Sequence, residues 1–220
     1  MCIRDSGEIA VEGSVVRVAA SAGTYVAPSV LVTVPKAVTS RIRFNPELPP
    51  SYAQYFTRQP SGATVKCQLV YRSPFWRAEG LNGIVVSESG PIDLVYDNSP
   101  PEGNPGVLVA FAEGNFGRSL FELSPAARRR AVVASIERYF GPAAGKFTRY
   151  EDAVWAAQPY TLGAYGSFNP PGVLTATGNA VNGPVGPIHF AGADYSAQWP
   201  GYMEGAIRTG RAAAAAIIKA

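Results

Sequence analysis

Two segments near the end of the chain decide the fold: residues 187–194 read PIHFAGAD, and residues 199–206 read WPGYMEGA. The first segment is an apolar strand that ends at Gly192, where a backbone without a side chain lets a ligand approach closely. The second begins a helix of small residues, whose first N–H groups favour an anionic or electron-rich ligand. The pattern alone fits a nucleotide-binding edge, and it also fits a strand–helix unit that packs tightly through Gly and Ala.

The passage before these segments, residues 158–187, is rich in Gly, Pro and Tyr and shows no periodicity. A long irregular stretch inside a compact domain is usually functional. We therefore expect a functional role for this passage, which leads into a strand at 187–191 and a final helix that starts at Gly201.

The middle of the chain predicts a sheet. Residues 64–71 read TVKCQLVY and alternate with period 2, which places the apolar side chains on one face of a strand and Lys66 on the other. Further strands are expected at 83–87, 92–96 and 107–112.

One helix is clearly marked in the sequence. Ser124 is a good N-cap, Pro125 suits the first helical position, and apolar residues recur at helical spacing up to residue 140. Gly141 is the expected stop. We interpret this helix as part of the scaffold.

The start of the chain predicts a β-meander over residues 8–34, closed by Pro35. Residues 1–6, MCIRDS, resemble a translated adapter sequence and are set aside from the fold. Because the strand-like pattern begins directly at residue 7, we expect the natural start of the protein to lie upstream.

Composition excludes several classes of function. The 220 residues are 47% hydrophobic and 16% charged, which is enough apolar material for a core. The 19 basic residues face 16 acidic ones without forming a basic stripe, so no nucleic-acid partner is expected. No apolar run reaches the roughly 18 to 20 residues that span a bilayer. We expect a soluble protein of the bacterial cytoplasm that does not bind a membrane.

The chain has two cysteines and one histidine, which excludes a Cys/His zinc cluster and a disulfide framework. His189 lies inside the apolar strand, where a structural role is favoured over that of a catalytic base. Hydrolase chemistry through a Ser–His or Cys–His pair is therefore disfavoured, and no metal site is predicted.

The chain resembles the flavin-containing amine oxidases, the family of monoamine, polyamine and putrescine oxidases. The segments at 187–194 and 199–206 are similar to the C-terminal flavin motif of that family. Further family landmarks occur in the expected order at 44–49 (FNPELP), 65–67 (VKC), 71–76 (YRSPFW), 101–103 (PEG) and 168–172 (FNPPG). The resemblance covers everything after residue 6 and is more specific than a single glycine fingerprint.

This resemblance implies an α/β, two-domain FAD-dependent amine oxidase fold, with a Rossmann-type FAD domain and a sheet-based substrate domain. The family's dinucleotide-binding G-x-G-x-x-G lies near the start of its complete members, and this chain contains no G-x-G. We therefore expect a C-terminal fragment with the N-terminal part missing. Residues 7–55 and 160–220 are expected in the FAD domain, and residues 56–159 in the substrate-binding domain.

The resemblance also implies which residues line the flavin: Gly192, Ala193, Asp194, Tyr202 and Met203. The backbone N–H of Met203 is expected near the pyrimidine carbonyl, where a donor would stabilise negative charge on reduced flavin. The family more often has Glu at position 194. Read alone, Asp194 also fits an acid that accepts from the amides of a helix N-terminus.

Lys66 and Trp155 correspond to two further family positions. The resemblance implies that Lys66 holds a water against flavin N5 and that Trp155 packs on the flavin. Read alone, Lys66 also fits a solvated strand residue and Trp155 an ordinary core residue.

Tyr165 and Tyr202 match the two tyrosines that form an aromatic cage in front of the flavin in this family. Their π faces would attract the amine and guide it to the reactive edge. Ala164 stands where mitochondrial monoamine oxidases carry the cysteine that bonds to FAD. The resemblance therefore implies a non-covalent FAD.

The implied reaction is FAD-dependent oxidative deamination: a primary amine or diamine becomes an imine and then an aldehyde, while O2 is reduced to H2O2. The partners are thus a small-molecule amine and O2, and a homodimer is left open. Three alternatives stand beside this hypothesis: an L-amino-acid oxidase, a carotenoid-type desaturase, which would lack the paired tyrosines, and a truncated non-catalytic chain. The isolated fragment is expected to be inactive.

Overall fold

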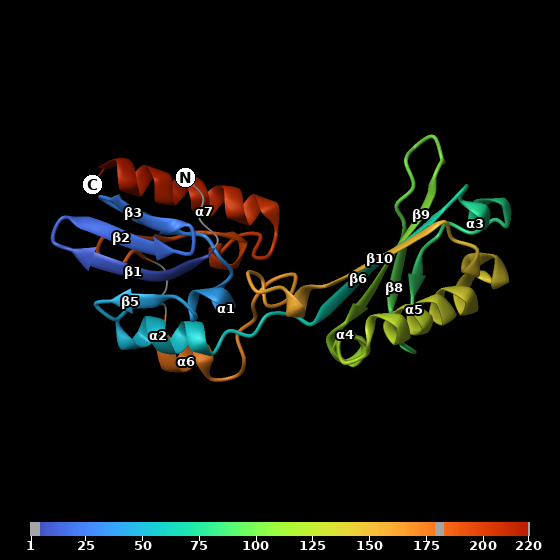
Figure 1. Cartoon of the computed structure of the whole chain (residues 1–220), viewed down its shortest axis with the longest axis horizontal. Coiled ribbons are helices and arrows are strands. Elements are labelled where there is room, and N and C mark those ends of the chain that lie inside the picture. Colours follow the sequence, from blue (N-terminus) through green and yellow to red (C-terminus); the bar gives the residue numbers. More distant parts are fainter. Residues whose placement is uncertain (1–4, 179–182, 220) are drawn as a thin grey trace. The chain divides into compact units, whose positions relative to one another are not determined.

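The structure is a computed structural model that describes residues 5–178 and 183–219. The chain folds into two compact units (Figure 1): unit 1 consists of Met1–Ser61 and Pro159–Ala220, and unit 2 of Gly62–Gln158. The expected boundary after residue 55 falls inside a helix, α2 (Pro50–Thr57), so the structural boundary lies further along the chain. The assignment of FAD binding and substrate binding to the two units stays a prediction.

Unit 2 is built on an antiparallel sheet of five strands in the order β10-β6-β9-β8-β7. The strands are β6 (Thr64–Tyr71), β7 (Val85–Val86), β8 (Leu94–Asp97), β9 (Gly106–Glu113) and β10 (Arg149–Val154). The alternation predicted for β6 is confirmed, because Val65, Cys67, Leu69 and Tyr71 are all buried on one face. β10 is an addition to the expected strands.

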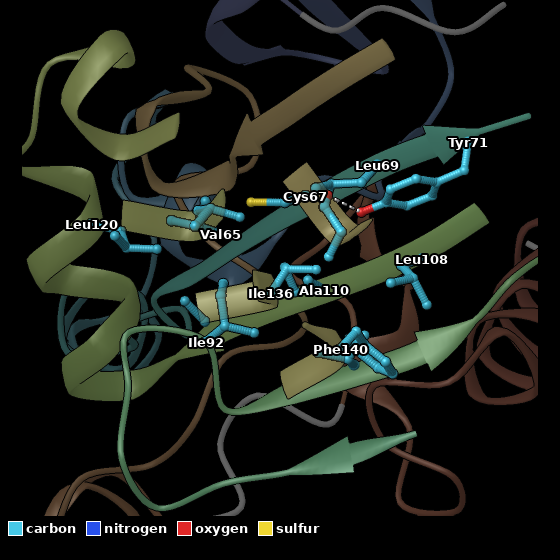
Figure 2. Close-up of a cluster of buried hydrophobic side chains, with 14 of the residues drawn as sticks. Val65, Cys67, Leu69, Tyr71, Ile92, Leu108, Ala110, Leu120, Ile136 and Phe140 are labelled. Atoms are coloured by element: carbon cyan, nitrogen blue, oxygen red, sulfur yellow. Dashed lines mark hydrogen bonds between the residues drawn. The ribbon is translucent and has the colours of Figure 1, made fainter. Parts of the chain in front are cut away.

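Helices cover that face of the sheet: α3 (Phe75–Ala78), α4 (Gly114–Phe121) and α5 (Pro125–Phe140), with the 3-10 turn η1 (Pro142–Gly145). The 3-10 turn η2 (Trp155–Ala157) follows β10 directly. The predicted scaffold helix α5 is confirmed, since the Oγ of Ser124 accepts from the backbone N–H of Ala127 at 3.4 Å and Gly141 follows the last turn at φ 77°. Figure 2 shows Ile136 and Phe140 of this helix among the buried side chains of the sheet.

A buried ion pair fastens α5 to the edge strand β10. The guanidinium of Arg128 donates to both carboxylate oxygens of Asp152, at 3.0 and 3.2 Å. The hydroxyl of Tyr150 donates to the same carboxylate at 2.9 Å. Burial raises the pKa of Tyr150, so this hydroxyl keeps its proton and remains a donor.

Unit 1 contains the predicted meander, formed by β1 (Ser6–Glu12), β2 (Val15–Ala20) and β3 (Gly23–Ala27). The strand β5 (Arg43–Asn45) extends the sheet in parallel with β1, which gives the order β3-β2-β1-β5. Ser6, which was expected to stand outside the fold, is the first residue of β1.

The buried strand expected at the end of the meander leaves this sheet. β4 (Val30–Val32) pairs in parallel with β11 (Ile188–Phe190) from the end of the chain. His189 is buried within β11, next to Ile188. This two-stranded pair joins the two parts of the chain that make up unit 1.

The helices of unit 1 are α1 (Lys36–Thr39), α2, α6 (Val173–Thr177) and α7 (Met203–Lys219), with the 3-10 turn η3 (Ala193–Tyr195). The helix α6 interrupts the passage expected to be irregular. The final helix starts at Met203 rather than at Gly201, whose φ of 79° belongs to the preceding turn. Within the described part of the chain, none of the helices has both the length and the apolar character that crossing a membrane requires.

Candidate functional site

An open cavity of about 210 Å³ in unit 1 collects several of the predicted site residues. It lies where the end of β4, the loop around residues 161–166 and the turn after β11 meet. Its lining residues include Thr33, Val34, Pro35, Thr161, Gly163, Tyr165, Gly166, Gly192, Ala193 and Asp194. Tyr165 and the flavin-motif residues 192–194, which are far apart in the sequence, are therefore brought to one place.

The turn at Gly192 needs glycine. Its φ is 144°, a backbone conformation that side chains rarely tolerate. Its N–H donates to the hydroxyl of Thr209 on α7, and that hydroxyl donates to the carbonyl of Gly192, both at 3.0 Å. The end of β11 is thus held against α7 while its backbone stays without a side chain.

Asp194 ties this turn to the loop that carries Tyr165. Its carboxylate accepts from the backbone N–H of Ser167 at 3.2 Å and from the Ser167 hydroxyl at 2.9 Å. A Cβ on Gly166 would lie 2.9 Å from Oδ1 of Asp194, so a larger residue there would displace this carboxylate. Asp194 therefore holds the 166–167 loop. Among the described residues, its carboxylate makes no hydrogen bond to the first amides of α7.

The start of α7 lies beside the same loop. An ideal Cβ on Gly166 is 3.7 Å from the Cα of Gly201, and the N–H of Gly201 donates to the carbonyl of Ala193 at 3.2 Å. Tyr165 follows Ala164 through a cis peptide bond and is 62% exposed, and Tyr202 is 65% exposed. The two predicted cage residues are therefore carried by touching segments and keep exposed rings.

Met203 is the first residue of α7 and is 85% exposed. The first N–H groups of a helix have no partner within the helix and carry the positive end of its dipole. The carbonyl of Tyr202 accepts from Ala206, which starts the helical ladder. The amide predicted to meet the flavin thus lies at an exposed helix N-terminus.

Lys66 and Trp155 belong to unit 2. Lys66 is half-buried on the face of β6 opposite the core, and its Nζ lies 5.7 Å from the ring centroid of Phe111. It is therefore not a fully solvated strand residue. Trp155 opens η2 directly after β10 and is half-buried. Their roles toward a flavin stay predictions.

Lys36, the buried first residue of α1, was not among the predicted site residues. It lines a second cavity of unit 1, of about 510 Å³, together with Tyr55, Ser167, Asn169, Asp194 and Tyr195. The signal was present, because Lys36 follows the apolar strand residues and Pro35 directly and precedes Ala37-Val38. A lysine in such apolar surroundings is rarely buried without a partner.

Comparison with known proteins relates this chain to a family of flavin-dependent enzymes. The profile of the family described as flavin containing amine oxidoreductase matches residues 6–218. An L-amino acid dehydrogenase of Synechocystis sp. is 37% identical over 210 residues, which cover 96% of this chain and 45% of that protein. A flavin-containing amine oxidase of Danio rerio is 34% identical over 192 residues, covering 86% of this chain and 37% of the relative.

Among solved structures, a putrescine oxidase bound to putrescine superposes with a TM-score of 0.90 at 35% sequence identity. The match covers 98% of this chain and 48% of the putrescine oxidase. The chain thus spans about half the length of the relatives that it matches, and the fold assigned from the sequence is confirmed.

Proposed function

The chain belongs to the flavin containing amine oxidoreductase family, and we propose that the complete enzyme oxidises a small amine with FAD as cofactor. By complete enzyme we mean a protein with the full length of the relatives that contains this chain. The observation that carries the proposal is the meeting of Tyr165, Gly192, Ala193 and Asp194 around one cavity, next to the exposed start of α7.

The residues present fit a flavin. Gly192 leaves its backbone open to a flat ligand, and the turn after it lines a cavity of about 210 Å³. The N–H of Met203 at the helix N-terminus offers a donor to an electron-rich carbonyl. A bound flavin would supply the acceptor for the hydride equivalent that leaves the carbon bearing the amine, with an imine, then an aldehyde, and H2O2 from O2 as products.

The chain's own part in this reaction is binding and orientation. The exposed rings of Tyr165 and Tyr202 offer π faces to an amine, and a π face attracts a cation by about 0.5 to 2 kcal/mol. Asp194 keeps the loop of Tyr165 in place through Ser167. We assign the cage to these two tyrosines and the flavin-facing backbone to residues 192–194 and 203.

FAD is proposed to be held without a covalent bond, because Ala164 has no sulfur to form one. Acid precipitation of the complete enzyme followed by centrifugation should leave the yellow colour in the supernatant. Flavin that stays with the pelleted protein would contradict this part of the proposal.

Lys66 is proposed to act during turnover, where a cation stabilises charge that develops only in the reaction. Lys66→Met should slow flavin reoxidation in rapid-mixing experiments while the FAD content stays unchanged. Lys146→Met is the matched control, because Lys146 is exposed in the same unit. Equal reoxidation rates in the two variants would show that Lys66 has only a structural role.

Oxidation of an L-amino acid is the second candidate, favoured by the 37% identity to the Synechocystis L-amino acid dehydrogenase. The two candidates differ in whether the substrate carries a carboxylate. Anaerobic mixing of the complete enzyme with putrescine, benzylamine or L-phenylalanine tests them, with bleaching of the flavin absorbance as readout. Bleaching by the amines alone supports amine oxidation, bleaching by L-phenylalanine alone supports the second candidate, and no bleaching by any of the three argues against both.

A further inference from the structure

Lys36 is a lysine that unit 1 buries without an ion pair. Only 7% of it is exposed. Among residues 5–178 and 183–219, the recorded ion pairs leave its ammonium group without a carboxylate. A charge removed from water is costly unless an opposite charge or several hydrogen bonds compensate it. The buried ammonium group of Lys36 therefore requires a group that compensates its charge.

The immediate partners of Lys36 are neutral. Its Nζ donates to the hydroxyl of Tyr55 at 2.7 Å and lies 4.9 and 5.2 Å from the ring centroids of Tyr55 and Tyr195. Burial raises the pKa of Tyr195, so that phenol does not supply a negative charge at neutral pH. An ammonium group has three N–H donors, and this bond uses one of them. The remaining donors are available to an acceptor in the adjoining cavity.

That cavity, of about 510 Å³, offers a second donor and a nearby carboxylate. The Oδ1 of Asn169 accepts from the Nε2 of Gln59 at 2.7 Å, which leaves the Nδ2 of Asn169 as a donor. Asp194 lines the same cavity, and its oxygens already accept from Ser167. The lining is thus one cation, neutral donors and one carboxylate that is engaged elsewhere.

We propose that this cavity is a carboxylate-binding site in which Lys36 forms the ion pair and Asn169 adds a hydrogen bond. A monoanion matches the single ammonium group, and Asp194 would repel the double charge of an inorganic phosphate more strongly than the single charge of a carboxylate. A metal cation would be repelled by Lys36 itself. The carboxylate has two sources: a free small molecule, or an Asp or Glu side chain from the part of the complete enzyme outside this chain.

The site can be tested without turnover. The complete enzyme is crystallised in buffers free of carboxylates, and matched crystals are soaked in sodium acetate or in sodium chloride. We expect a carboxylate oxygen within hydrogen-bond distance of the Nζ of Lys36. If it is present in both crystals and comes from a side chain, the source is the enzyme; if it appears only with acetate, the source is a free ligand.

A solution measurement separates the same sources. For a free ligand, acetate should raise the Tm of the wild type by roughly 2 to 4 °C over chloride at equal ionic strength, because it binds only the folded state. Lys36→Met should lose this rise, and Lys146→Met, which removes an exposed lysine, should keep it. For a side chain, acetate should change the Tm of none of these proteins.

Three results would overturn the proposal. One is density at Nζ for water or chloride alone in both crystals, including a water that bridges Lys36 to Asp194. Another is a flavin phosphate oxygen at Nζ, which would make the cavity part of the cofactor site. The third is a rise in Tm with acetate that survives in Lys36→Met. A bleached flavin in the presence of amines would leave these outcomes unchanged, so the site and the proposed oxidation fail separately.

Discussion

Both units bury aromatic side chains, those of unit 1 including Tyr52, Tyr55 and Phe56, but unit 1 also carries two tyrosines that are more than half exposed. In unit 2, Trp76, Tyr71 and Phe140 are buried in one core, where the hydroxyl of Tyr71 and the Nε1 of Trp76 also find acceptors at 2.9 Å. In unit 1, Tyr165 and Tyr202 are exposed beside turns that require glycine. Aromatic side chains thus stabilise the cores of both units, whereas Tyr165 and Tyr202 lie outside the core of unit 1 and are carried by backbone turns.

The largest effect is expected from Trp76→Ala in unit 2. Removing a fully buried indole, together with its hydrogen bond to Asp97, should cost about 3 to 5 kcal/mol in the free energy of unfolding. Urea unfolding of the complete enzyme measures this loss. Trp199→Ala, which removes an exposed tryptophan of unit 1, should cost less than about 1 kcal/mol. Equal losses of unfolding free energy in the two variants would show that the exposed Trp199 stabilises the fold as much as the buried Trp76.

A smaller loss is expected from Gly205→Ala in α7. The new Cβ would lie 2.3 Å from the carbonyl oxygen of Trp199, so the turn that carries Tyr202 must move, at a cost of about 1 to 3 kcal/mol. Gly210→Ala in the same helix meets no atom within 4 Å and should stabilise by roughly 0.5 to 1 kcal/mol. Thermal unfolding compares them, and a Gly205→Ala variant as stable as Gly210→Ala would show that the turn is not tightly packed.

The exposed tyrosines of unit 1 should affect the reaction more than the stability. Tyr165→Leu or Tyr202→Leu removes a π face worth about 0.5 to 2 kcal/mol toward a cation, or roughly a few-fold to thirty-fold in kcat/KM. The matched Tyr→Phe variants keep the ring and should stay near wild type. The measurement is kcat/KM for a primary amine per mole of bound FAD. If kcat/KM of the Leu variants lies within twofold of the wild-type value, the two tyrosines do not form an aromatic cage for the amine.

The smallest effect is expected in the pH dependence of unit 2. Burial raises the pKa of the Cys67 thiol from 9.0 to about 12. An unfolded thiol ionises above pH 9 while the folded one does not, so this contribution to stability is complete below pH 9 and is lost as the pH rises toward 12. Iodoacetamide at pH 9 should therefore modify Cys67, followed by mass spectrometry of its peptide, only as fast as unit 2 opens. Rapid modification of the folded protein would show that the core admits solvent.

Unit 2 was the easier unit to predict from the sequence, for physical reasons. β6 alternates strictly because one face meets a core, and α5 carries both its cap and its stop. β10 was missed because Arg149 and Glu151 are exposed at the edge of the sheet, where no alternation of apolar residues is needed. α4 was missed because it begins with Gly114 and is too short to show a clear period.

The site in unit 1 was predicted only in part. The flavin motif and the two tyrosines came from the family resemblance, since glycine turns leave no periodic pattern. The bond between Asp194 and Ser167 could not be predicted, because the two residues are far apart in the sequence and meet only when β11 and the loop after Tyr165 fold together. Lys36 was overlooked because lysine side chains are mostly exposed, although the apolar residues on both sides of Lys36 indicated its burial.

The parallel pairing of β4 with β11 has a consequence for synthesis on the ribosome. Val30 must wait for Ile188 before it can pair, and at 5 to 20 residues per second that interval lasts roughly 8 to 32 s. During that time the whole of unit 2 emerges and can fold first, while the meander of unit 1 exposes unpaired strand edges and apolar side chains. We therefore expect nascent chains of this protein to engage chaperones mainly through residues 6–57, and to release them only when the last strand has left the exit tunnel.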